Sequence, residues 1–163
     1  MPRCGWKWLG MAADGKSAYQ GGFLYEPDGE NPYHILAIGG HIWKVMPDWT
    51  TAPIDLSAQF GLTMPADQTH SYFCQAEKFL IIQAGDYVTL PLFWDGTTLR
   101  RSRGITNGAV DPGTPGVNEI PAAGPMDYYM GRVWYAQGRN YSAGDIVGGN
   151  SGTVANSFRD DVI

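Results

Sequence analysis

Residues 78–101 read KFLIIQAGDYVTLPLFWDGTTLRR, and this stretch decides the predicted fold. Residues 79–82 form a short run of apolar aromatic and β-branched side chains, whose length and composition favour a strand buried on both faces over a helix. A second apolar run at residues 90–94 contains Pro91, a residue that sheets tolerate at edges and bulges. The stretch therefore predicts two strands of one antiparallel ladder.

Glycine-containing turns mark two predicted hairpins. Asp95-Gly96 provides the positive φ that a tight type I′ turn requires, and residues 97–101 follow as a short, charged outer strand. Residues 33–38 and 41–46 flank Gly39-Gly40, which predicts a two-residue hairpin turn. Both patterns are structural and indicate no catalytic role.

Other elements follow from the same reasoning. Residues 50–70 are predicted to form a long connection with a short strand at residues 54–56. Further strands are predicted at residues 126–129 and 132–136. No window of 11 residues has sustained apolar spacing at i, i+3, i+4 and i+7, so at most one or two short helical turns are expected.

The composition is typical of an all-β chain with tight turns. The 163 residues include 22 glycines, six Trp and nine Tyr, whereas charged residues make up only 17%. About 11 glycines would be expected at the usual share of roughly 7%. We expect a single all-β domain over residues 1–163, or the N-terminal part of a larger β-propeller. Few charges and many aromatic side chains also predict surfaces that other subunits cover.

The bulk properties argue against several function classes. The net charge is -5 and no basic stripe is present, so no specific nucleic-acid binding is expected. No run of about 20 apolar residues is present, so we expect no membrane segment, and the first residues lack the pattern of a signal peptide. Cys4 and Cys74 form no metal-ligand pattern, which favours buried free thiols, and no cofactor or metal is expected.

Three segments align as a weak internal repeat. Residues 34–39, 78–83 and 132–137 each place a polar residue before four mainly apolar ones, at offsets of 44 (from 34 to 78) and 54 (from 78 to 132). Such a period is close to that of propeller blades, which bury their faces by stacking on neighbours. We therefore predict antiparallel hairpins arranged as propeller-like blades, incomplete because three repeats are fewer than the usual minimum of four. A β-sandwich is the alternative architecture.

The aligned segments also supply the predicted core. Their apolar positions predict that Trp134 is largely buried and that six other side chains are mostly buried: Leu36, Ile38, Leu80, Ile81, Ile82 and Val133.

Residues 102–118 are rich in Gly and Pro, and no packed element is predicted there. We expect this segment to become ordered mainly through contact with a neighbouring subunit, because its few apolar side chains bury too little surface to offset the entropy cost of ordering it. A plain flexible loop is the alternative. Three arginines, which can pair with carboxylates of the next subunit, and three apolar residues are the interface candidates: Arg100, Arg101, Arg103, Ile105, Val110 and Val117.

Four stretches resemble a family of phage and prophage virion proteins: QGGFLYEPDG (20–29), ILAIGGHIWKV (35–45), FLIIQAGDYVTLPLFWDGTTLRRS (79–102) and IPAAGPMDYYMGRVWYAQGRNYSAGDIVGGNSGT (120–153). Members resemble the β-propeller platform of the tail tubular, or nozzle, proteins of short-tailed phages. The resemblance implies a β-rich structural protein of the virion tail, with no cofactor and no catalytic residues to transfer.

The same resemblance carries expectations about assembly. We expect the protein to be assembled into the virion tail in the host cytoplasm, with other tail proteins as partners and with further copies in a homo-oligomeric ring. The sequence stops where the family pattern continues, so the chain is expected to be an N-terminal piece or a shortened member.

Two other functions are alternatives. A carbohydrate-binding module for host-surface attachment would stack exposed aromatic side chains on sugars, although the same side chains also suit a core. The candidates for glycan contact are Trp49, Trp94, Tyr128 and Tyr129. A glycan depolymerase would need two carboxylates about 5–9 Å apart. The carboxylates considered are Asp67, Glu77, Asp86 and Asp95. No GxSxG, HExxH or Ser/His/Asp spacing is present, so we expect no enzyme.

Overall fold

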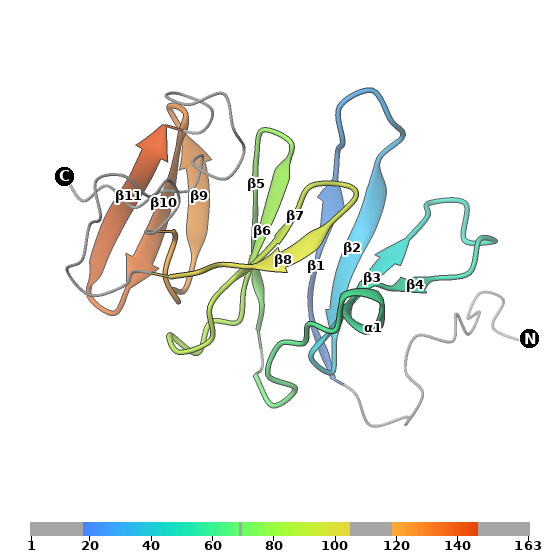
Figure 1. The fold of residues 1–163 in the computed structure, drawn as a ribbon, viewed down its shortest axis with the longest axis horizontal. Coiled ribbons are helices and arrows are strands. Elements are labelled where there is room, and N and C mark those ends of the chain that lie inside the picture. The colour runs from blue at the N-terminus through green and yellow to red at the C-terminus, as the bar shows by residue number, and fades with distance from the viewer. Residues whose placement is uncertain (1–17, 69, 105–118, 147–163) are drawn as a thin grey trace, which may run out of the picture.

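A computed structural model describes residues 18–68, 70–104 and 119–146, which form three small antiparallel sheets (Figure 1). The first sheet has the order β1 (Tyr19–Tyr25), β2 (Tyr33–Ile38), β3 (His41–Val45) and β4 (Ile54–Asp55). The second has the order β5 (Tyr72–Ala76), β6 (Phe79–Gln83), β7 (Leu92–Trp94) and β8 (Leu99–Arg101). The third has the order β11 (Asn140–Ile146), β10 (Arg132–Gln137) and β9 (Met126–Tyr129).

The all-β class is therefore confirmed. The described residues contain one helix, α1 (Leu56–Phe60), of five residues. It begins where the Asp55 carboxylate accepts a hydrogen bond from the Ala58 backbone N–H at 2.9 Å, and it ends at Gly61, which has a φ of 66°. The strand predicted at residues 54–56 is thus real but one residue shorter, because Leu56 begins the helix instead.

The middle sheet is buried between its two neighbours. The first core cluster joins the first and second sheets, and its members include Tyr33, Ile35, Leu80, Ile82 and Leu92. The second cluster joins the second and third sheets, and its members include Phe79, Ile81, Phe93, Val133 and Tyr135. All five side chains of β6 are buried, which confirms a strand covered on both faces.

The three segments of the weak repeat become β2, β6 and β10. Each is paired with the strand before it and with the strand after it in the chain, so each is an inner strand of its own sheet. The sheets stand in an open row in Figure 1, and three stacked sheets differ from a two-sheet sandwich. Closure into a propeller remains a prediction.

Burial was predicted correctly for four of the seven core residues and wrongly for Trp134. Leu80, Ile81, Ile82 and Val133 are buried. Trp134 is 38% exposed, because side chains alternate along β10 and its neighbours Val133 and Tyr135 take the face toward the middle sheet.

The same alternation of side chains explains why the burial predicted for two residues of β2 is wrong. Leu36 and Ile38 are only partly buried, since Ile35 and Ala37 occupy the face that packs on the middle sheet. Periodicity in one strand cannot distinguish the two faces when both carry apolar side chains.

One of the two predicted hairpin turns is confirmed. Ile38 pairs with His41, so Gly39-Gly40 is a two-residue turn, and the two glycines have φ values of 58° and 81°. The turn at Asp95 is different, because Trp94 pairs with Leu99 and four residues lie between them.

Candidate functional site

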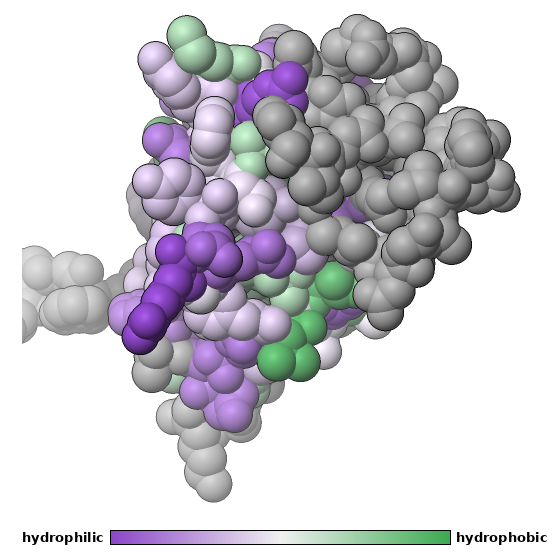
Figure 2. Space-filling model, turned by 90° about the vertical axis from the view of Figure 1, so that its left-hand side faces the viewer, coloured by the Kyte–Doolittle hydropathy of each residue, from purple (hydrophilic) through white to green (hydrophobic). Residues whose placement is uncertain are grey.

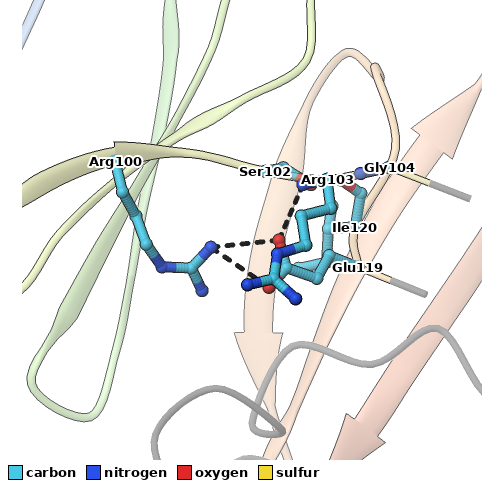
Figure 3. A network of polar contacts seen from close by, with 6 residues as sticks. All are labelled: Arg100, Ser102, Arg103, Gly104, Glu119 and Ile120. Carbon is cyan, nitrogen blue, oxygen red and sulfur yellow. Dashed lines mark hydrogen bonds and ion pairs between the residues drawn. The ribbon is translucent and has the colours of Figure 1, made fainter. Parts of the chain in front are cut away.

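The predicted interface arginines lie where the second sheet leads toward the third. Glu119 is buried, and both of its carboxylate oxygens accept hydrogen bonds from Arg100 Nη1, at 3.1 and 3.0 Å (Figure 3). The backbone N–H of Arg103 donates to the same carboxylate at 2.7 Å. A buried carboxylate is tolerated only with such partners, so this cluster fixes residue 119 beside the end of β8.

Ser102 completes this cluster. Its hydroxyl donates to the Ile120 carbonyl at 2.7 Å and accepts from the Gly104 N–H at 3.0 Å, while the Glu119 N–H donates to the Gly104 carbonyl at 3.2 Å. Residues 102–104 and 119–120 are therefore joined within the chain (Figure 3).

The remaining interface candidates have different surroundings. Arg101 donates to the Leu90 carbonyl at 2.8 Å and to the Thr63 carbonyl at 2.5 Å, whereas the Arg103 residue is exposed. Contact between the arginines and a next subunit stays a prediction. Three candidates lie outside the described residues: Ile105, Val110 and Val117.

The third sheet presents exposed aromatic side chains on the side away from the middle sheet. Tyr129 is 61% exposed and Tyr141 is 79% exposed, and the Trp134 indole N–H donates to the Tyr129 carbonyl at 3.2 Å. We call Tyr129, Trp134 and Tyr141 the aromatic face. Figure 2 views the molecule from the side of this sheet. A hollow of about 350 Å³ lies beside Trp134 and Tyr141.

The four glycan-contact candidates do not form one site. Trp94 is 3% exposed, and its indole N–H donates to the Tyr33 hydroxyl at 2.9 Å, so it belongs to the core rather than to a sugar-binding surface. Tyr128 is half-buried and donates to the Glu77 carboxylate. Burial and this carboxylate raise the pKa of Tyr128 to about 12. Tyr129 belongs to the aromatic face.

Trp49 is the candidate with the most distinctive surroundings. It follows β3, is 47% exposed, and stacks on His34 with ring centroids 5.5 Å apart. His34 also lines a groove of about 630 Å³, whose other lining residues are Leu24, Asn31, Pro32, Met46, Pro47 and Asp48. Trp49 is among the residues that the sequence predicts for a site, whereas the groove is not predicted, because its walls come from three separate segments.

A polar hollow of about 470 Å³ adjoins the groove. Asn31 and Met46 line both spaces, and the other residues of the polar hollow are Gly29, Glu30, Tyr33 and Lys44. The Lys44 ammonium group lies 3.9 Å from the centre of the Tyr33 ring. A positive and a negative side chain are thus both available beside the groove.

The carboxylates considered for a depolymerase have local roles. The Asp95 carboxylate accepts from the backbone N–H groups of Thr97 and Thr98, and Asp86 accepts in the same way from Val88 and Thr89. Burial disfavours the charge on Asp86, but hydrogen bonds outweigh it and hold the pKa of that carboxyl below its usual range. A general acid needs the opposite shift. Asp67 is exposed, and Glu77 accepts from Tyr128.

The described residues include one buried thiol. Cys74 is a buried free cysteine, as predicted, and burial, with a smaller effect of Asp127, raises the pKa of its thiol to about 12. Across the described ranges, no three His, Cys, Asp or Glu side chains lie close enough together to hold a metal ion. No helix among these residues is long and apolar enough to cross a membrane.

No protein family, curated protein or solved structure matches this chain.

Proposed function

We propose that this protein is a structural component of a phage tail, at the tail tube or nozzle platform, and that it acts by assembling with further copies and with other tail proteins. The resemblance of residues 20–29, 35–45, 79–102 and 120–153 to virion proteins supports this proposal. The stacked sheets support it too, because each blade of a propeller packs on neighbouring blades. The protein would then act in the virion tail and would not be an enzyme.

The aromatic face is the observation that carries the proposal. Between the sheets, side chains such as Ile81 and Val133 are buried on facing surfaces. The outer side of the third sheet instead leaves Tyr129, Trp134 and Tyr141 exposed. A further sheet placed there would bury these side chains, at about 25 cal/mol for each Å² of apolar surface.

A second copy of this chain can supply that sheet. Its first sheet, which packs on the middle sheet by one side only, would extend the row in the same direction. Such a contact is head-to-tail, and its repetition gives a ring when the rotation between copies closes. A closed ring of stacked sheets is also the arrangement that the propeller prediction requires.

The test is the size and shape of the purified full chain, by light scattering coupled to gel filtration and by negative-stain microscopy. We expect a ring for the wild-type protein and a smaller species for Trp134→Lys, because a charge on the aromatic face opposes burial. Val88→Lys is the control, since Val88 is exposed on a loop of the second sheet. A monomer at every concentration, or unchanged rings in Trp134→Lys, contradicts the proposed contact. Immunogold labelling away from the tail of phage particles contradicts the proposed location.

A further inference from the structure

The three sheets repeat one arrangement of faces, which becomes clear when their hairpins are aligned. The hairpins between β1 and β2, β5 and β6, and β9 and β10 lie on the same side of the row of sheets (top of Figure 1). The last residue pairs before the three hairpin loops are Tyr25 with Tyr33, Ala76 with Phe79 and Tyr129 with Arg132. By this alignment Trp134 is the counterpart of Ile35 and Ile81. Each of those two packs toward the next sheet of the row, so the aromatic face is the side by which a sheet packs on its successor.

Tyr25 shows how one sheet of the row docks on the next. It ends β1, is fully buried, and donates from its hydroxyl to the Lys78 carbonyl at 2.5 Å. Lys78 directly precedes β6, so this carbonyl belongs to the hairpin loop of the second sheet. A Cβ at Gly96, in the loop between β7 and β8, would lie 3.5 Å from the same hydroxyl oxygen. The tyrosine of the first sheet is therefore held by two loops of the second.

Tyr129 occupies the position of Tyr25 in the third sheet. It ends β9 and lies on the same face as Trp134, because it pairs with Arg132, which is two residues before Trp134 on β10. Tyr25 is buried under the following sheet, whereas Tyr129 is 61% exposed. The second sheet has Ala76 at this position, so only the first and third sheets carry a tyrosine there.

The groove on the first sheet is the counterpart of the place that holds the docked tyrosine on the second. Its walls include residues 31–32 of the hairpin loop and residues 46–48 of the loop after β3. The loops after β3 and β7 contain the same turn, in which Asp48 or Asp95 accepts hydrogen bonds from the backbone N–H groups two and three residues later. The groove is therefore bounded by the first-sheet equivalents of the two loops that hold the tyrosine.

The groove also opens on the side that a preceding sheet would cover. Leu24 and His34, its wall residues from the strands, pair with each other and face away from the second sheet. Their chain neighbours Tyr25 and Tyr33 take the buried side. Pro32 stands directly before β2, so its carbonyl corresponds to the one that accepts from the docked tyrosine.

We propose that Tyr129 of one copy inserts into the groove on the first sheet of the next copy, where its hydroxyl donates to the Pro32 carbonyl. This contact rests on the proposed assembly of copies and specifies its register. The groove suits a tyrosine, which combines an apolar ring with a hydroxyl that needs a partner when buried. Four of its seven wall residues are apolar: Leu24, Pro32, Met46 and Pro47. Each copy thus carries the inserting side chain on its third sheet and the receiving groove on its first.

The first test measures the apparent dissociation constant between copies of the full-length protein, by light scattering over a dilution series. Tyr129→Ala should raise this constant about tenfold or more, since a tyrosine inserted into a pocket contributes strongly to binding. Tyr129→Phe keeps the ring and loses the hydroxyl, so it should raise the constant about two- to tenfold. Tyr87→Ala is the matched control: Tyr87 is 49% exposed on the loop between β6 and β7, and its loss should leave the constant unchanged.

The second test locates the contact by photo-crosslinking. The full-length protein carries p-benzoylphenylalanine at residue 129, and isotopically light and heavy chains are mixed before irradiation. We expect crosslinks to residues 24, 31–34 or 46–48 of another copy, seen by mass spectrometry as peptide pairs of mixed isotope composition. Leu24→Lys should reduce these crosslinks, because it places a charge in the groove.

The outcomes separate this contact from assembly as such. Wild-type rings in which residue 129 crosslinks outside the groove, or only within its own chain, overturn the contact and leave the proposed assembly standing. An unchanged dissociation constant for Tyr129→Ala also overturns the contact alone. A wild-type protein that stays monomeric at every concentration contradicts both.

Discussion

At the scale of single residues, three loops share one pattern of hydrogen bonds from the backbone to an aspartate side chain. Asp48, Asp86 and Asp95 each accept hydrogen bonds from the backbone N–H groups two and three residues later. The residue after each aspartate has a positive φ, with values of 55° at Trp49, 59° at Tyr87 and 95° at Gly96. For the two aromatic residues this conformation costs about 1–2 kcal/mol, which the aspartate hydrogen bonds help to offset.

The Asp48 loop should be sensitive to acid. Hydrogen bonds from Thr51 and Thr50 lower the pKa of Asp48 to about 2, below its ordinary value of about 3.9. A lowered pKa in the folded protein means that the ionised carboxylate stabilises the loop fully above pH 4, and that this contribution is lost as the pH falls from 4 through 2. We expect the amide proton shifts of Thr50 and Thr51 to titrate with a midpoint near 2 by NMR. A midpoint near 3.9 would contradict the role of these hydrogen bonds.

Gly40 should be far less replaceable than Gly29, although both have a positive φ, of 81° and 74°. A Cβ at Gly40 would lie 2.3 Å from the Met64 carbonyl oxygen, whereas a Cβ at Gly29 meets no atom within 4 Å. Gly29→Ala should cost about 1–2 kcal/mol for its backbone alone. Gly40→Ala adds a backbone clash, so its urea midpoint should fall clearly further. Equal urea midpoints for the two variants would show that the backbone at this turn shifts at little cost to make room for the Cβ.

At the scale of elements, the Arg100–Glu119 pair joins the end of the second sheet to the segment before the third. Removing the arginine leaves a buried carboxylate with one fewer partner, which costs about 3–5 kcal/mol at a fully buried site. Because the Arg100 side chain is 32% exposed, we expect Arg100→Met to cost less, about 2–3 kcal/mol. Arg103→Met is the control, since the hydrogen bond from Arg103 to Glu119 comes from its backbone N–H, which the substitution keeps. Urea denaturation in which both variants lose the same stability would contradict this role.

Strand β6 should tolerate truncation poorly. Ile81 is fully buried in the core cluster between the second and third sheets, so Ile81→Ala should lower the free energy of unfolding by about 2–5 kcal/mol. Ile54→Ala removes the same atoms from an exposed position on the edge strand β4, and it should cost less than about 1 kcal/mol. Thermal or urea unfolding measures both. A loss below about 0.5 kcal/mol for Ile81→Ala would mean that this strand is not central.

The positions of strands were easier to predict from the sequence than the contacts between them. Residues 33–38, 126–129 and 132–136 coincide with observed strands within one residue, because each is a compact run beside clear turn chemistry. Strand β5 was missed, since its residues YFCQA show neither an apolar run nor a flanking Pro or Gly turn. The turn at Asp95 is two residues longer than the predicted one, because its carboxylate accepts hydrogen bonds from the backbone N–H groups of Thr97 and Thr98.

Contacts between sheets account for the remaining errors. Trp94 stands at a strand end next to a turn, which suggested exposure, but Tyr33 of the first sheet covers it. Glu119 lies at the edge of a Gly-rich and Pro-rich segment and was not recognised, because its partner Arg100 is 19 residues away. The groove beside Trp49 likewise depends on β1, β2 and the loop after β3 meeting in space. Such pairings depend on tertiary packing, which local patterns do not encode.

At the scale of the whole molecule, the row of sheets has a consequence for how the chain folds. Within each sheet, strands that are consecutive in the chain pair with each other, so most ladders close short loops, and this favours rapid formation. The middle sheet contributes to both core clusters and therefore is the natural nucleus on which the outer two condense. Ile81→Ala should then mainly slow refolding, whereas Val133→Ala should mainly speed unfolding, as stopped-flow chevrons would measure. Newly synthesised chains would gain their first lasting structure when the middle sheet, residues 72–101, has left the ribosome.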